Sequence, residues 1–383
     1  MEPGNVRLAI AGAGIGGLTA ALALSRRGFQ VEVFERAPAL EPVGAGLTLQ
    51  INAMRVLGRL GLGEKLAAKG VTPARARVLD DKGKVISELE LAPLSAELGA
   101  PCVTLHRASL QALLLEALSE VPVRLGAEVR GFEQGTRGVS VRLADGSEPT
   151  FDALIGADGI HSAVRAQLHG KVAPRYAGHT CWRGICEHGE ISERDLVTET
   201  WGKGSRFGLV PIGDGRLYWF AVVDAPAGGK DGPDVKAALL ARFGKWHREV
   251  PQAIEATPSE RIFRADLYDR PVLARWGEAS VTLLGDAAHP MTPNLGQGAC
   301  MAIEDGWVLA RGFSEAATVD AALRRYEALR QERTAATVKL ARRMGQLGQW
   351  SNGFARAVRN ALVHATPRAV AERQVRWLFD FKV

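Results

Sequence analysis

Hydrophobic residues follow two different patterns along this 383-residue chain. Short, mostly apolar runs at residues 6–10, 153–156 and 281–284 are typical of buried parallel strands, and glycine-rich turns follow each of them. Residues 171–269 instead contain segments rich in aromatic and β-branched residues, which predict an antiparallel sheet. Residues 75–91 read as a further pair of strands of that sheet. From residue 319 onward the pattern predicts helices over 319–347, 354–364 and 369–381, with Pro367 between the last two.

The first apolar run leads into the turn Gly12-Ala13-Gly14-Ile15-Gly16-Gly17, and a helix ended by Gly28 follows. Gly12 permits the tight turn, Gly14 lets the backbone approach a pyrophosphate, and Gly16 or Gly17 lets helix and strand pack closely. The helix N-terminus offers free N–H groups and a positive dipole to phosphates.

A second strand, residues 29–35, completes this unit and ends in Glu35. A carboxylate at that point can accept hydrogen bonds from a ribose diol. The unit therefore predicts a site for an ADP-containing dinucleotide, without distinguishing NAD from FAD. The uncharged stretch from Leu8 to Ser25 could suggest a membrane helix, but its glycines divide it into strand, turn and helix.

Two further motifs place carboxylates after apolar strands. Residues 153–165, ALIGADGIHSAVR, put Asp158 at a strand end, where an Asp-Gly turn with a helix cap is an equally good interpretation. Residues 281–299 put Asp286 before a loop rich in proline and glycine, with a helix starting near Ala299. A carboxylate there can bind a sugar-like hydroxyl, and the helix N-terminus can stabilise a developing negative charge.

Taken together, GAGIGG with Glu35, GADGIHSAVR and GDAAHPMTPNLGQGA resemble the class A flavoprotein monooxygenases, the para-hydroxybenzoate and salicylate hydroxylase group. The motifs occur in the family's order and, with their connections, cover most of the chain. The resemblance implies an α/β (α+β overall) fold. In it, a Rossmann-type FAD-binding domain (1–74, 100–170 and 270–318) is interleaved with an antiparallel-sheet substrate domain (75–99 and 171–269). Residues 319–383 form a C-terminal helical region.

The resemblance also assigns cofactor contacts. Glu35 would hold the adenosine ribose, Arg107 would meet the phosphates, and Asp286 would hold the ribityl or phosphate region. Asp158 would lie close and act indirectly, Pro293 would line the reaction site, and the strip Gly44-Ala45-Gly46 would lie near the isoalloxazine ring. The amides of Ala299 and Cys300 would face the flavin pyrimidine. The remaining expected contacts are Gly12, Gly14, Ile15, Gly16, Gly17, Arg36, Gly296 and Gly298.

Candidates on the substrate side are Arg206 and Tyr218, on adjacent predicted strands. Arg206 could anchor an anionic or carbonyl group and Tyr218 could hydrogen-bond a ring substituent, although a surface arginine and a core tyrosine would give the same sequence. Trp182, Phe207 and Trp219 are expected mostly in the core. His289 could act as a general base on a phenol, although the resemblance favours a structural role.

The net charge of +6 is concentrated in the C-terminal region. Basic residues without interleaved aromatic residues do not indicate nucleic-acid binding. Solvated helix faces explain the basic residues, while a weak contact with a membrane surface stays open. The four cysteines form no C-x-x-C pair and match no zinc pattern, so we expect no metal and reduced thiols in a cytoplasmic protein.

The predicted function is an FAD-dependent monooxygenase. The resemblance implies that NADH or NADPH reduces the flavin and that a C4a-hydroperoxide then hydroxylates a small aromatic or heteroaromatic substrate, using O2. No second glycine motif is present for the nicotinamide, which would bind transiently. A flavoprotein reductase or oxidase, an epoxidase and a non-catalytic nucleotide-binding protein remain alternatives, and the chain could be a monomer or a homodimer.

Overall fold

A computed structural model describes residues 1–40, 45–136 and 138–382, without the side chains of residues 368 and 369. Its first sheet has five parallel strands in the order β17-β11-β1-β2-β7. These strands are β1 (Arg7–Ala11), β2 (Gln30–Glu35), β7 (Val123–Leu125), β11 (Ala153–Gly156) and β17 (Val281–Leu283). The three apolar runs of the sequence thus lie side by side, and the turns that follow them meet at one edge of the sheet.

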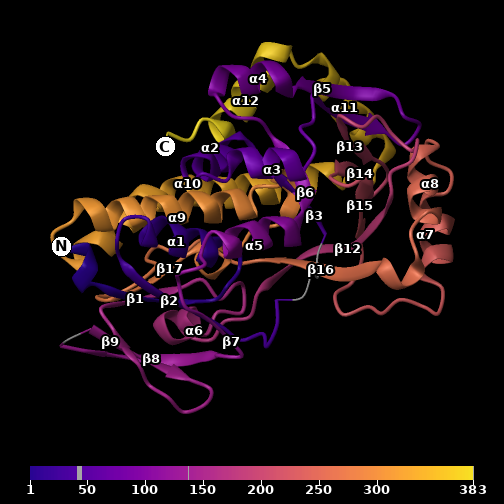
Figure 1. The fold of residues 1–383 in the computed structure, drawn as a ribbon. Helices are drawn as coiled ribbons and strands as arrows, with labels where there is room; N and C mark the ends of the chain where they lie inside the picture. Colours follow the sequence, from indigo (N-terminus) through magenta and orange to yellow (C-terminus); the bar gives the residue numbers. More distant parts are fainter. Residues whose placement is uncertain (41–44, 137, 383) are drawn as a thin grey trace.

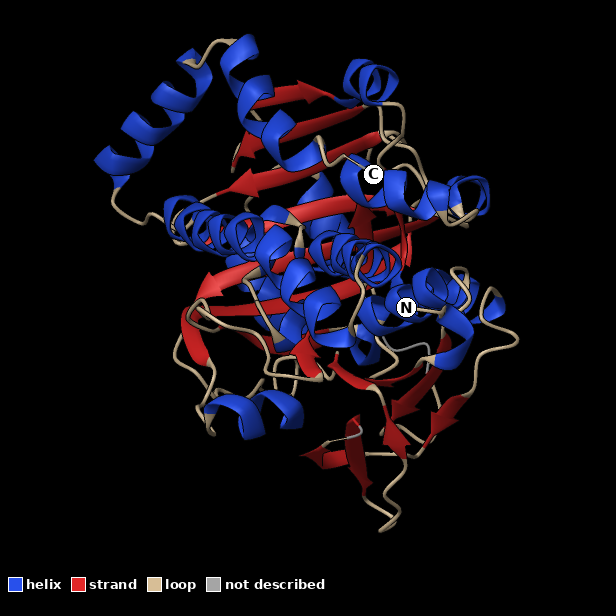
Figure 2. Cartoon of the chain, turned by 90° about the vertical axis from the view of Figure 1, so that its left-hand side faces the viewer, coloured by secondary structure: helices blue, strands red, loops and turns tan. Residues whose placement is uncertain are grey.

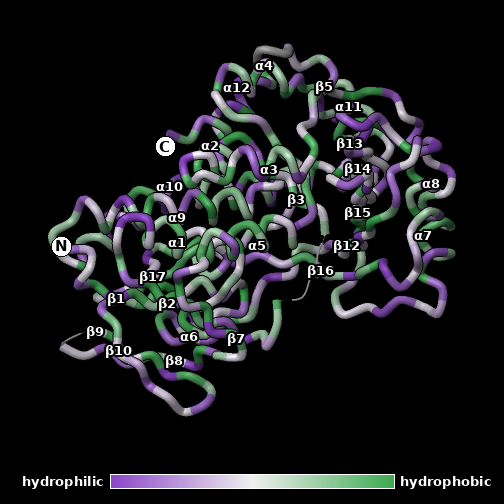
Figure 3. Tube along the Cα trace, viewed as in Figure 1, coloured by the Kyte–Doolittle hydropathy of each residue, from purple (hydrophilic) through white to green (hydrophobic). Residues whose placement is uncertain are grey.

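Two helices pack closely beside this sheet: α1 (Ile15–Ser25) and α9 (Gly298–Glu315). A Cβ on Gly306 of α9 would lie 2.8 Å from the backbone nitrogen of Ala20, so only glycine permits this approach. α1 is buried almost all round, which explains its uniformly apolar sequence. Figure 3 shows hydrophobic stretches gathered around α1, β1 and β17.

Other elements extend this part of the molecule. They are β3 (Gly46–Leu49), α2 (Ile51–Arg59), α3 (Gly63–Lys69), β6 (Val103–His106), α5 (Arg107–Glu116), β8 (Val129–Gly135), β9 (Gly138–Leu143), β10 (Thr150–Phe151) and α6 (Ala163–His169). β3 pairs with β6, and β8, β9 and β10 form a small antiparallel sheet.

The second large sheet has seven strands in the order β16-β12-β15-β14-β13-β4-β5. Its strands are β4 (Arg75–Asp80), β5 (Val85–Glu90), β12 (Arg175–Glu187), β13 (Leu196–Trp201), β14 (Ser205–Ile212), β15 (Arg216–Asp224) and β16 (Phe263–Asp269). All neighbours are antiparallel except β13 and β4, which run parallel. β4 and β13 can run parallel because the chain between them is long and passes through the part of the molecule that contains the five-stranded sheet. A connection of this length can bring the chain back into the sheet in either direction.

The two faces of this sheet are covered differently. Helices α7 (Val235–Phe243) and α8 (Glu249–Glu255) cover the outer face, where Phe207 and Trp219 stack at 5.3 Å in the core. The expected core positions of Phe207 and Trp219 are confirmed. The opposite face points toward the first domain.

The remaining helices are α4 (Leu91–Leu98), α10 (Val319–Gly348), α11 (Gly353–Ala365) and α12 (Arg368–Phe379). The last three match the helical C-terminal region predicted from the sequence, with Pro367 capping α12. Figure 2 shows α11 at the outer edge of the molecule and α12 folding back over it. Among the described residues no helix is long and apolar enough to cross a bilayer.

Candidate active site

The glycine turn between β1 and α1 has the geometry that its sequence predicts. Gly12 has φ +106°, and a Cβ there would lie 2.4 Å from the carbonyl oxygen of Ala157. A Cβ on Gly17 would meet the Gly12 oxygen at 2.0 Å. A Cβ added to Gly14, by contrast, would have no described atom from elsewhere in the chain within 4 Å, so this backbone borders open space. Gly12 and Gly17 serve packing, and Gly14 leaves room for a ligand.

Glu35 closes β2 beside this turn. Its Oε2 accepts a hydrogen bond from the amide of Ala13 at 2.8 Å, and its Oε1 accepts one from Ala37 at 2.9 Å. The carboxylate is thereby held next to the glycine turn with further lone pairs available for a ribose. Arg36, which follows it, is exposed.

Arg107 lies at the first turn of α5 and is exposed. Its amide donates to the carbonyl of Ala45 at 3.2 Å, and β3 places Gly46 opposite His106. The predicted phosphate-binding arginine and the predicted flavin strip are therefore adjacent. Gly44 lies outside the described residues.

Asp158 caps a helix. Its Oδ2 accepts hydrogen bonds from the amides of Ala163 at 2.7 Å and Val164 at 3.3 Å, while its Oδ1 is buried without a hydrogen-bond partner among the described residues. Burial raises the pKa of Asp158, although these hydrogen bonds oppose the rise. This geometry supports the indirect role predicted for Asp158.

The last residue of the same motif, Arg165, links it to the second carboxylate loop. The buried Arg165 guanidinium donates to the carbonyl oxygens of Ala287 at 2.9 Å and Ala288 at 3.0 Å. Burial lowers its pKa to about 10. Sequence reasoning gave Arg165 no function; an arginine in the short helix after an apolar strand is too weak a signal to show that it fastens another loop.

Asp286 lies in that loop, in the single turn Gly285–Ala287. Its side chain is exposed to solvent, yet desolvation by the surrounding protein raises its pKa, against the opposing influence of His289 and Arg107. The carboxyl group of Asp286 is thus both accessible to solvent and surrounded by enough protein to be desolvated. Arg107 and Asp286, predicted to bind the same cofactor, are thus close enough for the arginine to lower the pKa of the carboxyl group.

The loop that follows leads to the N-terminus of α9. Pro293 is exposed, and Gly296 has φ +64°. The first intrahelical hydrogen bond joins the amide of Met301 to Gln297 at 2.8 Å, so the amides of Gly298, Ala299 and Cys300 precede it and are available to a ligand. This is the arrangement predicted for stabilising negative charge on a ring.

A buried ionic network supports this loop from behind. His289 Nε2 lies 2.6 Å from Asp305, which also binds Arg330 at 2.7 Å. Arg330 contacts Glu304 at 2.5 Å, and Arg333 contacts it at 2.8 Å. Burial alone would raise the pKa of Asp305, but His289 and Arg330 outweigh it and lower that pKa. The bond to Asp305 holds one ring nitrogen of His289, while its Nδ1 is buried without a hydrogen-bond partner among the described residues.

The two substrate-side candidates both touch the cofactor side. Arg206 is buried and donates to Glu199 at 2.9 Å and to Asn294 at 2.5 Å, next to Pro293. Its Nε is buried without a partner in the described part of the chain. Tyr218 packs against the flavin strip, since a Cβ on Gly46 would lie 2.5 Å from its ring. Burial raises the pKa of Tyr218, so it remains a neutral donor.

Sequence reasoning missed two side chains on the same face of the sheet. Arg183 of β12 lies beside the hydroxyl of Tyr218 and the thiol of Cys181, and no carboxylate among the described residues forms an ion pair with it. Phe220 is paired across from Arg183, and its ring fills the space that a side chain at position 208 would need. Side chains alternate between the two faces of a strand, so the register of β12 against β15 would have placed Arg183 and Phe220 on this face. The sequence alone does not give that register.

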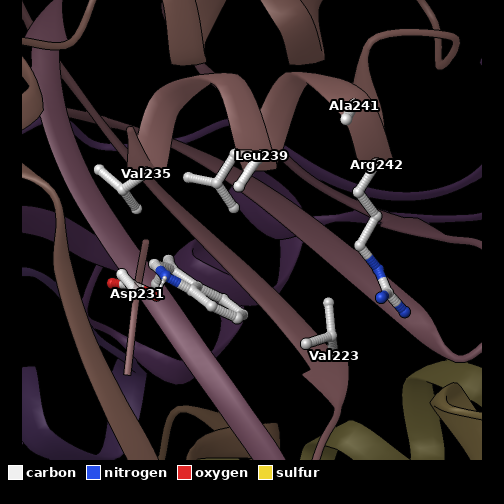
Figure 4. A pocket seen from close by; sticks show the side chains of 8 residues that line it. Val223, Asp231, Val235, Leu239, Ala241 and Arg242 are labelled. Atoms are coloured by element: carbon white, nitrogen blue, oxygen red, sulfur yellow. Dashed lines mark hydrogen bonds between the residues drawn. The ribbon is translucent and has the colours of Figure 1, made fainter. Parts of the chain in front are cut away.

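A separate pocket of about 360 Å³ lies on the outer face of the sheet. Figure 4 shows Val223, Asp231, Val235, Leu239 and Arg242 around it. These residues belong to the side covered by α7, opposite Arg206 and Tyr218. The pocket is therefore not part of the cofactor site.

All four cysteines are free and buried, as expected for reduced thiols. Burial raises the pKa of Cys102 and of Cys300 to about 12. The thiol of Cys300 therefore stays protonated and is not a reactive thiolate.

Comparison with known proteins agrees with this geometry. A family model described as an FAD binding domain matches residues 5–343. Aurachin C monooxygenase/isomerase of Stigmatella aurantiaca is 50% identical over 92% of both chains. The structure of Klebsiella pneumoniae HpxO complexed with FAD and uric acid has a TM-score of 0.92 at 32% identity and covers 98% of each chain. A salicylate hydroxylase substrate complex has a TM-score of 0.81 at 25% identity, over 99% of this chain and 96% of that one.

The fold and the site thus define a flavin-binding protein. The chain belongs to the FAD-binding domain family, among the class A flavin monooxygenases. The open backbone at Gly14, the held carboxylate of Glu35 and the free amides of α9 fit FAD.

Proposed function

We propose that this protein is an FAD-dependent monooxygenase that uses NADH or NADPH and O2 to hydroxylate a small aromatic or heteroaromatic molecule. One observation carries the proposal: the substrate-side sheet touches the cofactor side at both Gly46–Tyr218 and Asn294–Arg206. These contacts bring a polar and aromatic surface of the sheet next to the residues that would hold the flavin. The relatives described above are named for an aurachin, for uric acid and for salicylate, which agrees with a planar substrate.

The residues of the chain divide the work. When bound, FAD supplies the redox chemistry, namely reduction by the nicotinamide and activation of dioxygen. Glu35, Arg107 and Asp286 hold the ribose, phosphate and ribityl parts. The amides of Ala299 and Cys300 stabilise negative charge on the ring, because they point from an uncapped helix N-terminus.

The substrate side orients the ring to be hydroxylated. Tyr218 donates a hydrogen bond from its neutral hydroxyl, and Arg183 offers a cation that has no carboxylate partner among the described residues. A phenolate, carbonyl or other electron-rich oxygen on the substrate matches both groups. Arg206 acts as a positioning residue because two of its nitrogens already hold Glu199 and Asn294. Pro293 and the packed sheet exclude water from the reacting atoms.

The test uses the FAD-loaded enzyme, NADH or NADPH, and a panel of phenols, hydroxypyridines and quinolones. We expect one group of substrates to stimulate nicotinamide oxidation and to take up one atom from ¹⁸O₂. Stimulated oxidation with no labelled product and only peroxide formed would instead identify an oxidase or reductase. Light scattering on the same sample distinguishes a monomer from a homodimer.

A further inference from the structure

Helix α11 presents an apolar face to solvent. Phe354 is 79% exposed and Leu362 is 66% exposed. The outward side of the helix consists of the exposed residues Phe354, Ala357, Val358, Ala361, Leu362 and Ala365, with His364 at its margin. These positions recur at the three- and four-residue spacing of a single helical face.

The inward side of α11 carries arginines instead. Arg359 is 2% exposed, donates to the carbonyl oxygens of Leu347 and Gly348 at 3.0 Å each, and lies 4.8 Å above the ring of Trp201. Arg356 pairs with Asp81 at 3.1 Å. A surface helix normally turns its apolar face inward, and α11 does the reverse. Because the arginines fix the helix in place, folding does not explain the outward apolar residues.

The C-terminal region that carries this face is aromatic and basic. Trp350, just before α11, and Val370 and Trp377, on α12, are each between 41% and 45% exposed. Residues 339–382 contain nine Lys or Arg and two Glu or Asp. Four exposed cations of this region form no ion pair with any side chain that the structure describes: Lys339, Arg343, Arg373 and Lys382.

The size and charge of the face indicate its partner. A helix of this length is about 20 Å long and about 10 Å wide, so its face offers about 200 Å². A stable protein dimer buries about 800 Å² per partner. Exposed Trp and Phe with surrounding Lys and Arg are instead the pattern of a helix that lies in the headgroup region of an anionic bilayer.

We propose that the α11 face docks on an anionic lipid bilayer as a peripheral contact. Phe354, Val358 and Leu362 enter the interface, and the surrounding cations attract the headgroups. Through Arg359 and Trp201, which adjoins Glu199 and Arg206, the same helix is fastened to the substrate-side sheet. The contact therefore brings the substrate side of the enzyme to the membrane surface.

The test is co-sedimentation of the full-length, FAD-loaded protein with phosphatidylcholine vesicles, with and without about one-third phosphatidylglycerol. We expect binding to the anionic vesicles that weakens with salt. The double variant Phe354→Ser/Leu362→Ser should lower the partition coefficient about tenfold or more, since two exposed apolar side chains lose their burial. Its flavin absorbance should be unchanged because both side chains point to solvent.

A matched control is Val172→Ser/Phe263→Ser, two residues outside the C-terminal helices that are 62% and 54% exposed. It should bind vesicles as the wild type does. Equal loss in the control, or no binding of wild type to anionic vesicles, overturns the proposal. Loss of a dimer in the α11 variant, with no lipid binding by wild type, would assign the face to a second copy and overturn it equally.

Discussion

The two sides of the cofactor site use buried arginine in different ways. Behind the flavin loop, Arg330 is 1% exposed and both of its carboxylate partners are fully buried and paired. On the substrate-side sheet, Arg206 keeps an unpaired Nε and Arg183 has no carboxylate partner among the described residues. Charges that are fully paired with buried carboxylates build a rigid support, whereas an arginine that keeps a free donor or lacks a carboxylate partner is available to a ligand.

Breaking the buried ion pairs of Arg330 should have the largest effect on stability. Arg330→Met leaves Glu304 and Asp305 buried without their main cation, which should cost about 3–5 kcal/mol of the free energy of unfolding. We expect loss of bound flavin as the α9 N-terminus shifts. Thermal unfolding and flavin absorbance measure both effects.

The control is Arg325→Met on the same helix, since the Arg325–Glu315 pair is half exposed. It should change stability by less than about 1 kcal/mol. If both variants behaved alike, the buried network would not be the support we describe.

The glycine turn separates folding from binding. Gly12→Ala should destabilise the fold, because its φ is positive and its Cβ would meet Ala157 at 2.4 Å. Gly14→Val should leave the apoprotein folded, because a Cβ there would have no described atom from elsewhere in the chain within 4 Å, and should weaken FAD binding about a hundredfold by filling the space proposed for the pyrophosphate. Circular dichroism of apoprotein and titration with FAD separate the two results. A Gly14→Val protein that binds FAD normally would place the pyrophosphate elsewhere.

Removing the charge of Arg183, which has no carboxylate partner among the described residues, tests whether the sheet binds substrate. Arg183→Gln should raise KM for a substrate about tenfold or more and increase peroxide release, with thermal stability nearly unchanged. The control on the same strand is Arg175→Gln, whose partner Asp269 keeps Arg342 at 3.0 Å. It should leave KM unchanged. An effect on stability alone would show that Arg183 serves packing.

The smallest effects concern pH. Asp305 has a lowered pKa in the folded protein, so it contributes stability above the ordinary aspartate pKa of about 3.9, and this is lost as pH falls through the folded value. Asp158 has a raised pKa and acts with the opposite sign: its ionisation costs stability as pH rises above the ordinary value.

Asp158→Asn should therefore change stability at neutral pH by only about 1 kcal/mol or less, since Asn also caps a helix. Unfolding midpoints from pH 3 upward, compared between wild type and Asp158→Asn, measure the difference. Strong destabilisation of Asp158→Asn at neutral pH would show that its charge is needed.

Most of the cofactor side could be predicted from sequence, because each of its parts is local. The glycine turn, the strand-end carboxylates and the uncapped helix lie within short stretches whose spacing sets their geometry. The role of Arg165 could not be predicted, since it acts on carbonyls more than a hundred residues away. The α11 face also escaped prediction, because a helix does not reveal which side it turns to the protein.

The sequence by itself determined the Rossmann-type unit, the family and the three C-terminal helices, because periodicity and glycine placement act over a few residues. Only the tertiary structure decided which arginines are paired, that His289 is hydrogen-bonded to Asp305, and that Arg183 lies beside the hydroxyl of Tyr218. Those outcomes depend on strand register and on contacts between distant segments, where a shift of one residue turns every side chain to the other face.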